Sequence, residues 1–146
     1  MRQSLIFLPF ALMMIWTLAM MIVMVIRRGN DASRRGISIG SLPGTRDSAT
    51  KLGEGPLWSA RTQSSNDHVL NLFETPILFY ALCLALFVTS SVTTLIIITA
   101  WAYLGIRIVH GLIHISYNHV FHRFVAFGLS LMCLTIMIGS LLMAAI

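Results

Sequence analysis

The chain has 146 residues, of which 57% are hydrophobic and only 10% are charged, and its formal net charge is +5. A water-soluble domain carries roughly 45–50% apolar and about 25% charged residues, so this composition excludes one. It also excludes a disordered chain, which would be far less hydrophobic. The apolar residues form long unbroken runs, which favours membrane-spanning helices over a closed barrel. We expect no nucleic-acid partner, because no surface combining basic and aromatic residues is evident.

Four apolar runs predict an all-α integral membrane four-helix bundle that occupies residues 1–146 as one domain. The helices are expected at about 5–26, 69–88, 92–116 and 123–145. The first run has 22 uncharged residues, which as a helix extend about 33 Å and cross the hydrocarbon core. Two arginines follow it instead of a small-residue cleavage site, which favours a spanning helix over a signal peptide.

The largest polar segment, residues 27–67, is expected to be a cytoplasmic loop. It carries seven of the ten Lys and Arg residues, namely Arg27, Arg28, Arg34, Arg35, Arg46, Lys51 and Arg61. Positively charged loops stay on the cytoplasmic side, so both termini are predicted on the non-cytoplasmic side. Arg123, at the start of the fourth helix, falls on the same side as the loop and supports this orientation.

Polar residues within the spanning segments are the main functional signal. An ionisable group there costs about 2.5–3.5 kcal/mol at the helix centre, and it usually faces protein or a wet cavity. Helical spacing places three such residues on one face of the second helix and three on one face of the third. The first face holds Asp67, Asn71 and Glu74, and the second holds Arg107, His110 and His114. All of these except Asp67 are predicted to meet Arg123 in the cytoplasmic half.

Two interpretations of these residues remain open. In the first, Glu74 and Arg107 form a buried ion pair that neutralises two charges and fixes the helix register. That pair leaves Arg123, Asn71 and the histidines without partners, although buried polar groups need them. In the second interpretation, the donors bind a ligand: arginine holds a carboxylate with two hydrogen bonds, and Glu74 holds an ammonium group. A small zwitterion with more than one carboxylate, taken from the cytosol, fits this pattern.

A metal or haem site is a third, less favoured interpretation. His110 and His114 lie four residues apart, so both can face one ion from a helix. Arg107 and Arg123 would repel a cation, no thiolate lies nearby, and Glu74 is the one acidic ligand at hand. Haem ligands also usually come from two helices. We therefore expect no metal site.

Pro76 lies just inside the second predicted helix and allows two outcomes. It lacks a backbone donor, so it could kink the helix and open space beside the proposed site. It could equally be an early-turn proline that the helix tolerates without consequence.

These residues together resemble the MAPEG family, the membrane-associated proteins in eicosanoid and glutathione metabolism. The resemblance rests on an N-x-x-E-x-P motif at 71–76, an R-x-x-H motif at 107–110, and the later Arg123. It spans all four helices and is closest to short bacterial members. The resemblance implies a homotrimer in the lipid bilayer, expected to be the bacterial inner membrane, with glutathione bound between subunits near the cytoplasmic side.

The resemblance also implies individual roles. Asn71, Glu74, Arg107 and His110 would bind glutathione, with His114 as a weaker candidate. Arg123 would be the catalytic residue that stabilises the thiolate. A thiol with a pKa near 8.5 is mostly protonated at neutral pH, and a guanidinium favours its nucleophilic anion.

The implied function is a glutathione-dependent transferase or peroxidase that acts on lipophilic electrophiles. The alternative is a non-catalytic binding or scaffold protein of the same family. One departure favours that alternative: His114 stands where many of the enzymes have a tyrosine. A second weakens the case for a tight glutathione site: Asp67 and Leu70 stand where they have basic residues.

Overall fold

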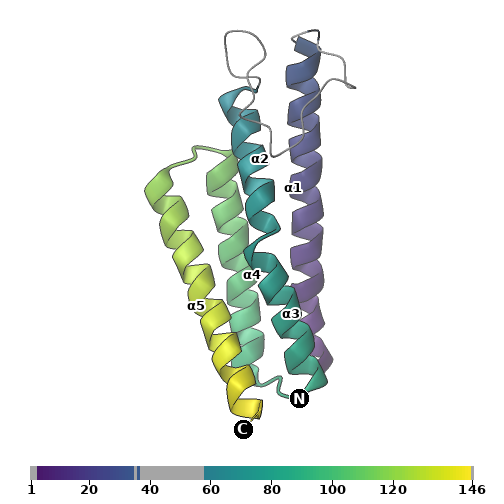
Figure 1. Ribbon diagram of the computed structural model, residues 1–146, viewed down its shortest axis with the longest axis vertical. Coiled ribbons are helices and arrows are strands. Elements are labelled where there is room, and N and C mark those ends of the chain that lie inside the picture. Colours follow the sequence, from purple (N-terminus) through teal and green to yellow (C-terminus); the bar gives the residue numbers. More distant parts are fainter. Residues whose placement is uncertain (1–2, 35, 37–57, 146) are drawn as a thin grey trace.

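The computed structural model describes residues 3–34, 36 and 58–145. A short 3₁₀ helix, η1 (Gln3–Ile6), leads into α1 (Phe7–Arg34), and α2 (Ala60–Leu72), α3 (Thr75–Val88), α4 (Thr94–Ile115) and α5 (Val120–Ala145) follow. Figure 1 shows the helices side by side along one long axis, with both termini at the same end. The opposite end, where α1 and α4 finish and α2 and α5 begin, is called the loop end below.

The described residues contain four helical stretches that are long and apolar enough to cross a membrane. They are Gln3–Arg34, Ala60–Val88, Thr94–Ile115 and Val120–Ala144. The prediction of an all-helical protein with four membrane-spanning helices is therefore confirmed. The side of the membrane that each end faces, and the trimer, stay predictions.

Two helices extend further into the polar segment than the hydropathy pattern predicted. The first helix was expected to end at residue 26 and runs to Arg34, and the second was expected from residue 69 and begins at Ala60. Hydropathy marks only the part of a helix that lipid accepts, whereas polar residues continue a helix when its neighbours supply partners. Both ends of the predicted 27–67 loop are therefore helical. Its central part, residues 37–57, lies outside the described residues.

Arg27 is one of the groups that extend the bundle beyond the apolar runs. Its Nη1 donates to the carbonyl oxygen of Arg61 at 3.1 Å and to Oγ of Ser65 at 2.7 Å, both on α2. Its Nη2 donates to the carbonyl oxygen of Ile115, at the end of α4, at 3.2 Å. A single guanidinium thus joins α1, α2 and α4 at the loop end.

The predicted second spanning helix is interrupted. Its two parts, α2 and α3, are separated by Phe73 and Glu74, and Pro76 lies in the first turn of α3. Proline has no N–H to donate to the carbonyl four residues earlier, so a continuous helix would lose a hydrogen bond here. A proline in a first turn loses nothing, because that N–H has no helical partner. The helix is thus interrupted beside Pro76, as in the first of the two outcomes, and Pro76 occupies an early turn, as in the second.

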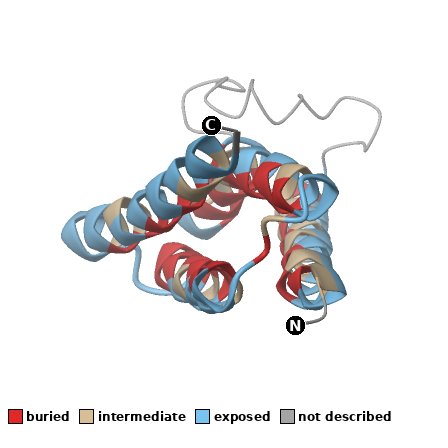
Figure 2. Ribbon diagram, turned by 90° about the horizontal axis from the view of Figure 1, so that it is seen from below, coloured by how far each residue is buried: buried red, intermediate tan, exposed pale blue. Residues whose placement is uncertain are grey.

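Apolar side chains fill the interior of the bundle and also cover its exterior. Figure 2 shows the buried parts of the helices turned toward the centre and the exposed parts turned outward. Core side chains such as Met13, Phe79, Leu86 and Met137 are fully buried, while large apolar side chains also cover the outside. An apolar exterior is what lipid tails require of a spanning helix.

Candidate functional site

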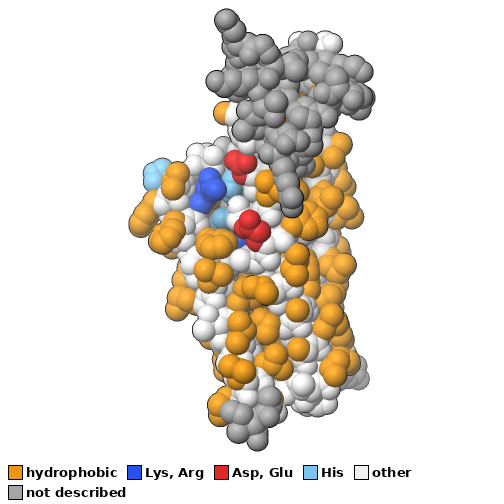
Figure 3. Space-filling model, viewed as in Figure 1, with side chains coloured by type: hydrophobic (Ala, Val, Ile, Leu, Met, Phe, Trp, Pro, Cys, Tyr) orange, Lys and Arg blue, Asp and Glu red, His pale blue; other side chains and the backbone are white. Residues whose placement is uncertain are grey.

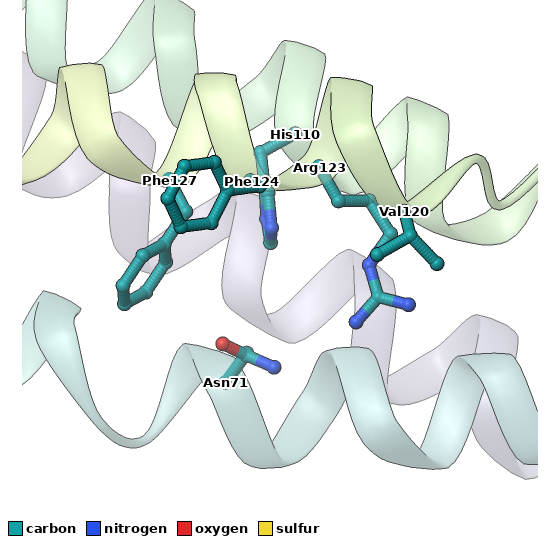
Figure 4. Close-up of a pocket in the computed structure, with 6 residues that line it drawn as sticks. All are labelled: Asn71, His110, Val120, Arg123, Phe124 and Phe127. Carbon is teal, nitrogen blue, oxygen red and sulfur yellow. The ribbon is translucent and has the colours of Figure 1, made fainter.

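A pocket of about 250 Å³ lies where the first turns of α5 face α2 and α4. Its lining residues are Asn71, His110, Val120, Arg123, Phe124 and Phe127. Figure 4 shows the Asn71 amide on α2 pointing across the pocket toward the Arg123 guanidinium on α5, with the His110 ring on α4 beside them. The structure therefore brings three of the six predicted site residues to one pocket.

Arg123 reaches the pocket with part of its hydrogen-bonding capacity unused. Its Nη1 donates to Oδ1 of Asn118 at 2.9 Å. Asn118 lies in the turn before α5 with a φ of 51°, a left-handed conformation that asparagine tolerates better than most residues. The buried Nε of Arg123 has no hydrogen-bond partner within the described residues. The guanidinium is thus held in place from one side and can donate to an anion from the other.

Asn71 occupies the last turn of α2, directly before the helix break. Its Nδ2 donates to the carbonyl oxygen of Asp67 at 3.3 Å. This bond fixes the amide, and its oxygen is an acceptor at the pocket wall that lies on the side of the amide away from Arg123 (Figure 4). An amide acceptor and a guanidinium donor together suit a ligand with both N–H and anionic groups.

Arg107 is completely buried and lies outside the pocket lining. Its Nη2 donates to the carbonyl oxygen of Asn71 at 3.0 Å. Its Nε and Nη1 have no partner in the described part of the chain. Arg107 therefore contacts the backbone that positions Asn71 and does not line the pocket itself.

Glu74 is exposed at the helix break, and no ion pair joins it to Arg107 in the described structure. The interpretation of these two residues as a buried, mutually neutralising pair is therefore wrong. Pro76 ends the helical register that the spacing argument assumed, so Glu74 does not continue the buried face of α2. Its carboxylate remains available to a ligand.

The third helix carries the predicted polar stripe on its inner face. Arg107, His110 and His114 are all buried on α4, as their spacing of three and four residues predicts. His114 does not line the pocket. Its Nδ1 lies 3.1 Å from Oγ of Ser64 on α2, and the same hydroxyl also hydrogen-bonds to the His114 carbonyl oxygen.

Sequence reasoning missed His68, which is buried on α2 and packs against both histidines of α4. Its ring centroid lies 5.8 Å from that of His110 and 5.2 Å from that of His114. We call these three residues the histidine cluster. An ionisable residue three positions before Asn71 was a usable signal, but only the packing of α2 on α4 shows that the three rings meet.

Gly111 permits this packing. A Cβ atom built on Gly111 would lie 2.6 Å from Nε2 of His68 and 2.8 Å from Cζ2 of Trp16. Only glycine allows the His68 ring to lie directly on the backbone of α4.

Two further histidines lie away from this cluster. His119 and His122 are exposed, and their rings are 4.6 Å apart. No group of three or more histidine, cysteine, aspartate or glutamate side chains in the described residues is arranged to hold a metal ion.

Charged and imidazole side chains gather on one face of the molecule. Figure 3 shows basic, acidic and histidine side chains close together in the half of the bundle nearer the loop end, within a surface that is otherwise largely apolar. This is the region in which the sequence predicted a polar site.

A comparison with protein families gives one match, and it is to the family that the motifs resembled. The model of the MAPEG family matches residues 6–143, nearly the whole chain. No curated protein and no solved structure is significantly similar to the chain.

Proposed function

The chain belongs to the MAPEG family, and on that premise we propose that it is a glutathione-dependent transferase or peroxidase acting on lipophilic electrophiles. One observation carries the proposal: Arg123, Asn71 and His110 line the same pocket, although they come from three helices. A shared guest explains why these costly polar groups converge within a membrane-spanning bundle.

Arg123 is the proposed catalytic residue. A guanidinium close to the glutathione sulfur stabilises the thiolate over the thiol, and the thiolate is the nucleophile. Only Nη1 of the guanidinium has a hydrogen-bond partner within the described residues, so a terminal nitrogen can donate to the sulfur without loss of the bond to Asn118.

The polar ends of glutathione are assigned to the remaining predicted residues. Asn71 and His110 contact the part of glutathione inside the pocket, and the exposed carboxylate of Glu74 binds its ammonium group. Arg107 positions Asn71 by a hydrogen bond to its backbone carbonyl oxygen. His114 acts indirectly, from behind the side chains that line the pocket.

The other wall of the pocket suits a lipophilic substrate. Val120, Phe124 and Phe127 are apolar, and Phe124 is 73% exposed on the outer surface of α5. An electrophile dissolved in the bilayer can therefore approach from the lipid side while glutathione arrives from water.

One subunit supplies only part of this site. Small-molecule sites usually enclose about 300–1,000 Å³, and glutathione is a tripeptide, whereas this pocket has about 250 Å³. A neighbouring copy in a homotrimer would complete it. We further propose that the loop end faces the cytoplasm of a bacterium, with the bundle in the inner membrane.

A non-catalytic glutathione-binding or scaffold protein is the second candidate. It is favoured by His114, which stands where many enzymes of the family have a tyrosine and which does not line the pocket. Such a protein would keep the binding residues without forming a thiolate.

Turnover in a reconstituted bilayer separates the two candidates. The protein in nanodiscs is mixed with glutathione and either 1-chloro-2,4-dinitrobenzene or cumene hydroperoxide, and glutathione binding is measured by calorimetry. An enzyme consumes glutathione, and Arg123→Ala lowers its rate by about a hundredfold or more. Arg34→Ala, which removes an exposed arginine of α1, should match the wild type. Binding without turnover supports the scaffold protein, and neither binding nor turnover contradicts both candidates.

A further inference from the structure

The histidine cluster has features that the proposed binding site does not explain. His68, His110 and His114 are 1%, 2% and 0% exposed, respectively. The rings of His110 and His114 are 5.7 Å apart, and His68 contacts both. Three imidazoles are thus packed together inside the bundle, and only His110 lines the pocket.

Four ring nitrogens of the cluster are buried without a hydrogen-bond partner in the described part of the chain. They are both nitrogens of His68, Nδ1 of His110 and Nε2 of His114. Buried polar atoms nearly always have a partner in the protein or in ordered water. These nitrogens can therefore pair with one another, or with water held between them, after small ring rotations.

The contacts of Ser64 determine the tautomer of His114. The Ser64 hydroxyl lies within hydrogen-bonding distance of both the His114 carbonyl oxygen and Nδ1. A hydroxyl has one proton and a carbonyl oxygen only accepts, so Ser64 donates to the carbonyl and accepts from Nδ1–H. The Nε2 atom of His114 then carries a free lone pair inside the histidine cluster.

The cluster connects two openings in the protein. At one end, His110 lines the pocket that contains Arg123. At the other end, Ser64 lines a separate hollow of about 220 Å³ at the loop end, together with Ala60, Arg61, Ile115, Ser116, Tyr117 and Asn118. The connection runs from the pocket through His110 and His114 to Ser64, with His68 in contact with both rings.

We propose that His110, His114 and Ser64, assisted by His68, form a proton relay from the glutathione pocket to the hollow at the loop end. This inference rests on the proposed function, in which the thiol of glutathione must lose a proton inside a largely apolar environment. Proton transfer by positioned histidines is a common solution to that problem.

Each step of the relay conserves atoms and charge. The S–H bond of glutathione breaks, and its electron pair stays on sulfur. The ring nitrogen of His110 on the pocket side takes the proton. The other ring nitrogen of His110 then passes a proton to Nε2 of His114. The Ser64 hydroxyl turns from the His114 carbonyl oxygen to water in the hollow. Nδ1 of His114 then gives its proton to Ser64 as the hydroxyl's own proton passes to that water. The imidazoles end neutral, and a proton returning after turnover resets them. No oxidant or reductant is required.

The surroundings disfavour a metal ion in the histidine cluster. The charged groups that interact with His114 are Arg123 on α5, Arg107 on α4 and Asp67 on α2. Two of these three are cationic and repel a divalent ion. The described residues also contain no metal-holding arrangement of three such side chains.

Stopped-flow mixing with glutathione tests the relay. Thiolate absorbance gives the amount of thiolate at equilibrium, and a pH indicator gives the rate of proton release. Ser64→Ala should slow release by about tenfold or more while leaving the final thiolate absorbance unchanged, and Ser64→Thr, which keeps a hydroxyl, should restore the rate. Ser65→Ala is the matched control, because the neighbouring hydroxyl bonds to Arg27 and Arg61 instead. It should release protons at the wild-type rate.

A second variant and a solvent test keep the relay falsifiable if Ser64→Ala does not fold. His114→Gln should also slow release, and release from the wild type should be slower in D₂O. Wild-type rates in both Ser64→Ala and His114→Gln, or equal rates in H₂O and D₂O, would overturn the relay and leave the thiolate site intact. Zn²⁺ binding that His68→Ala abolishes would also overturn it. Absence of any thiolate in the wild type would instead reject the proposed function, and the relay with it.

Discussion

Arg107 donates a hydrogen bond from Nη2 to the backbone carbonyl oxygen of Asn71, 3.0 Å away. The same carbonyl accepts from the backbone N–H of Glu74 at 3.4 Å, across the turn between α2 and α3. A buried guanidinium thus holds the backbone at the point where the helix breaks. Because Asn71 lines the pocket, the geometry of the pocket depends on a residue that does not line it.

Replacing Arg107 with leucine should weaken glutathione binding more than it destabilises the protein. A hydrogen bond to a charged group contributes about 1.5–3 kcal/mol, so misplacing Asn71 should lower the affinity about tenfold or more. The unpartnered donors of Arg107 are costly to bury, and their removal offsets part of the lost stability. Calorimetry and thermal unfolding of Arg107→Leu measure the two effects. Unchanged affinity would show that Arg107 does not position Asn71.

Glu74→Gln distinguishes a ligand-binding carboxylate from a structural one. The side chain is exposed and has no ion pair to Arg107, so the unfolding free energy should change by no more than about 0.5 kcal/mol. Glutathione affinity should fall about tenfold, because the ammonium group loses a charged partner. A large loss of stability with unchanged affinity would contradict this role.

The sequence predicted the fold in outline because lipid imposes simple rules. Runs of about 20 apolar residues identify spanning helices without knowledge of their packing. The same rules do not apply beyond the lipid, and this is why the helical segments at 27–34 and 60–67 were predicted as loop. Arg27 stabilises those segments through contacts to α2 and α4, and such tertiary contacts leave no periodic signal.

The candidate site was only partly predictable for a related reason. Helical spacing correctly placed Arg107, His110 and His114 on the inner face of α4. It failed at Glu74, because Pro76 ends the register in which Glu74 was counted. It also missed His68, whose role depends on the register of α2 against α4 and on the absence of a side chain at Gly111.

Gly111→Ala tests the close approach of α2 to α4. The added Cβ would overlap the His68 ring and Trp16, and such overpacking typically costs about 1–3 kcal/mol. Gly105→Ala is the matched control on the same helix, because a Cβ there meets nothing within 4 Å. Alanine favours a helix over glycine by about 1 kcal/mol, so the control should be as stable as the wild type or more so. Thermal unfolding of both variants measures the difference, and equal stabilities would refute the packing argument.

The proposed orientation makes a prediction about the C-terminus. With the arginine-rich loop end in the cytoplasm, both termini lie on the opposite side. A single cysteine added after Ile146, in a background that lacks Cys83 and Cys133, should react with an impermeant maleimide added outside intact cells. A cysteine placed in the 37–57 segment should react only after the cells are opened. The reverse pattern would invert the orientation.

The most direct test of the account is the ultraviolet absorbance of glutathione thiolate on the purified wild type and on Arg123→Ala, at a glutathione concentration that saturates both. Because Arg123 lines the pocket with a donor to spare, the wild type should develop thiolate absorbance at neutral pH, and the variant should bind glutathione without it. Equal thiolate absorbance in the two proteins, or none in a wild type that binds glutathione, would contradict the assignment of Arg123 as the residue that stabilises the thiolate.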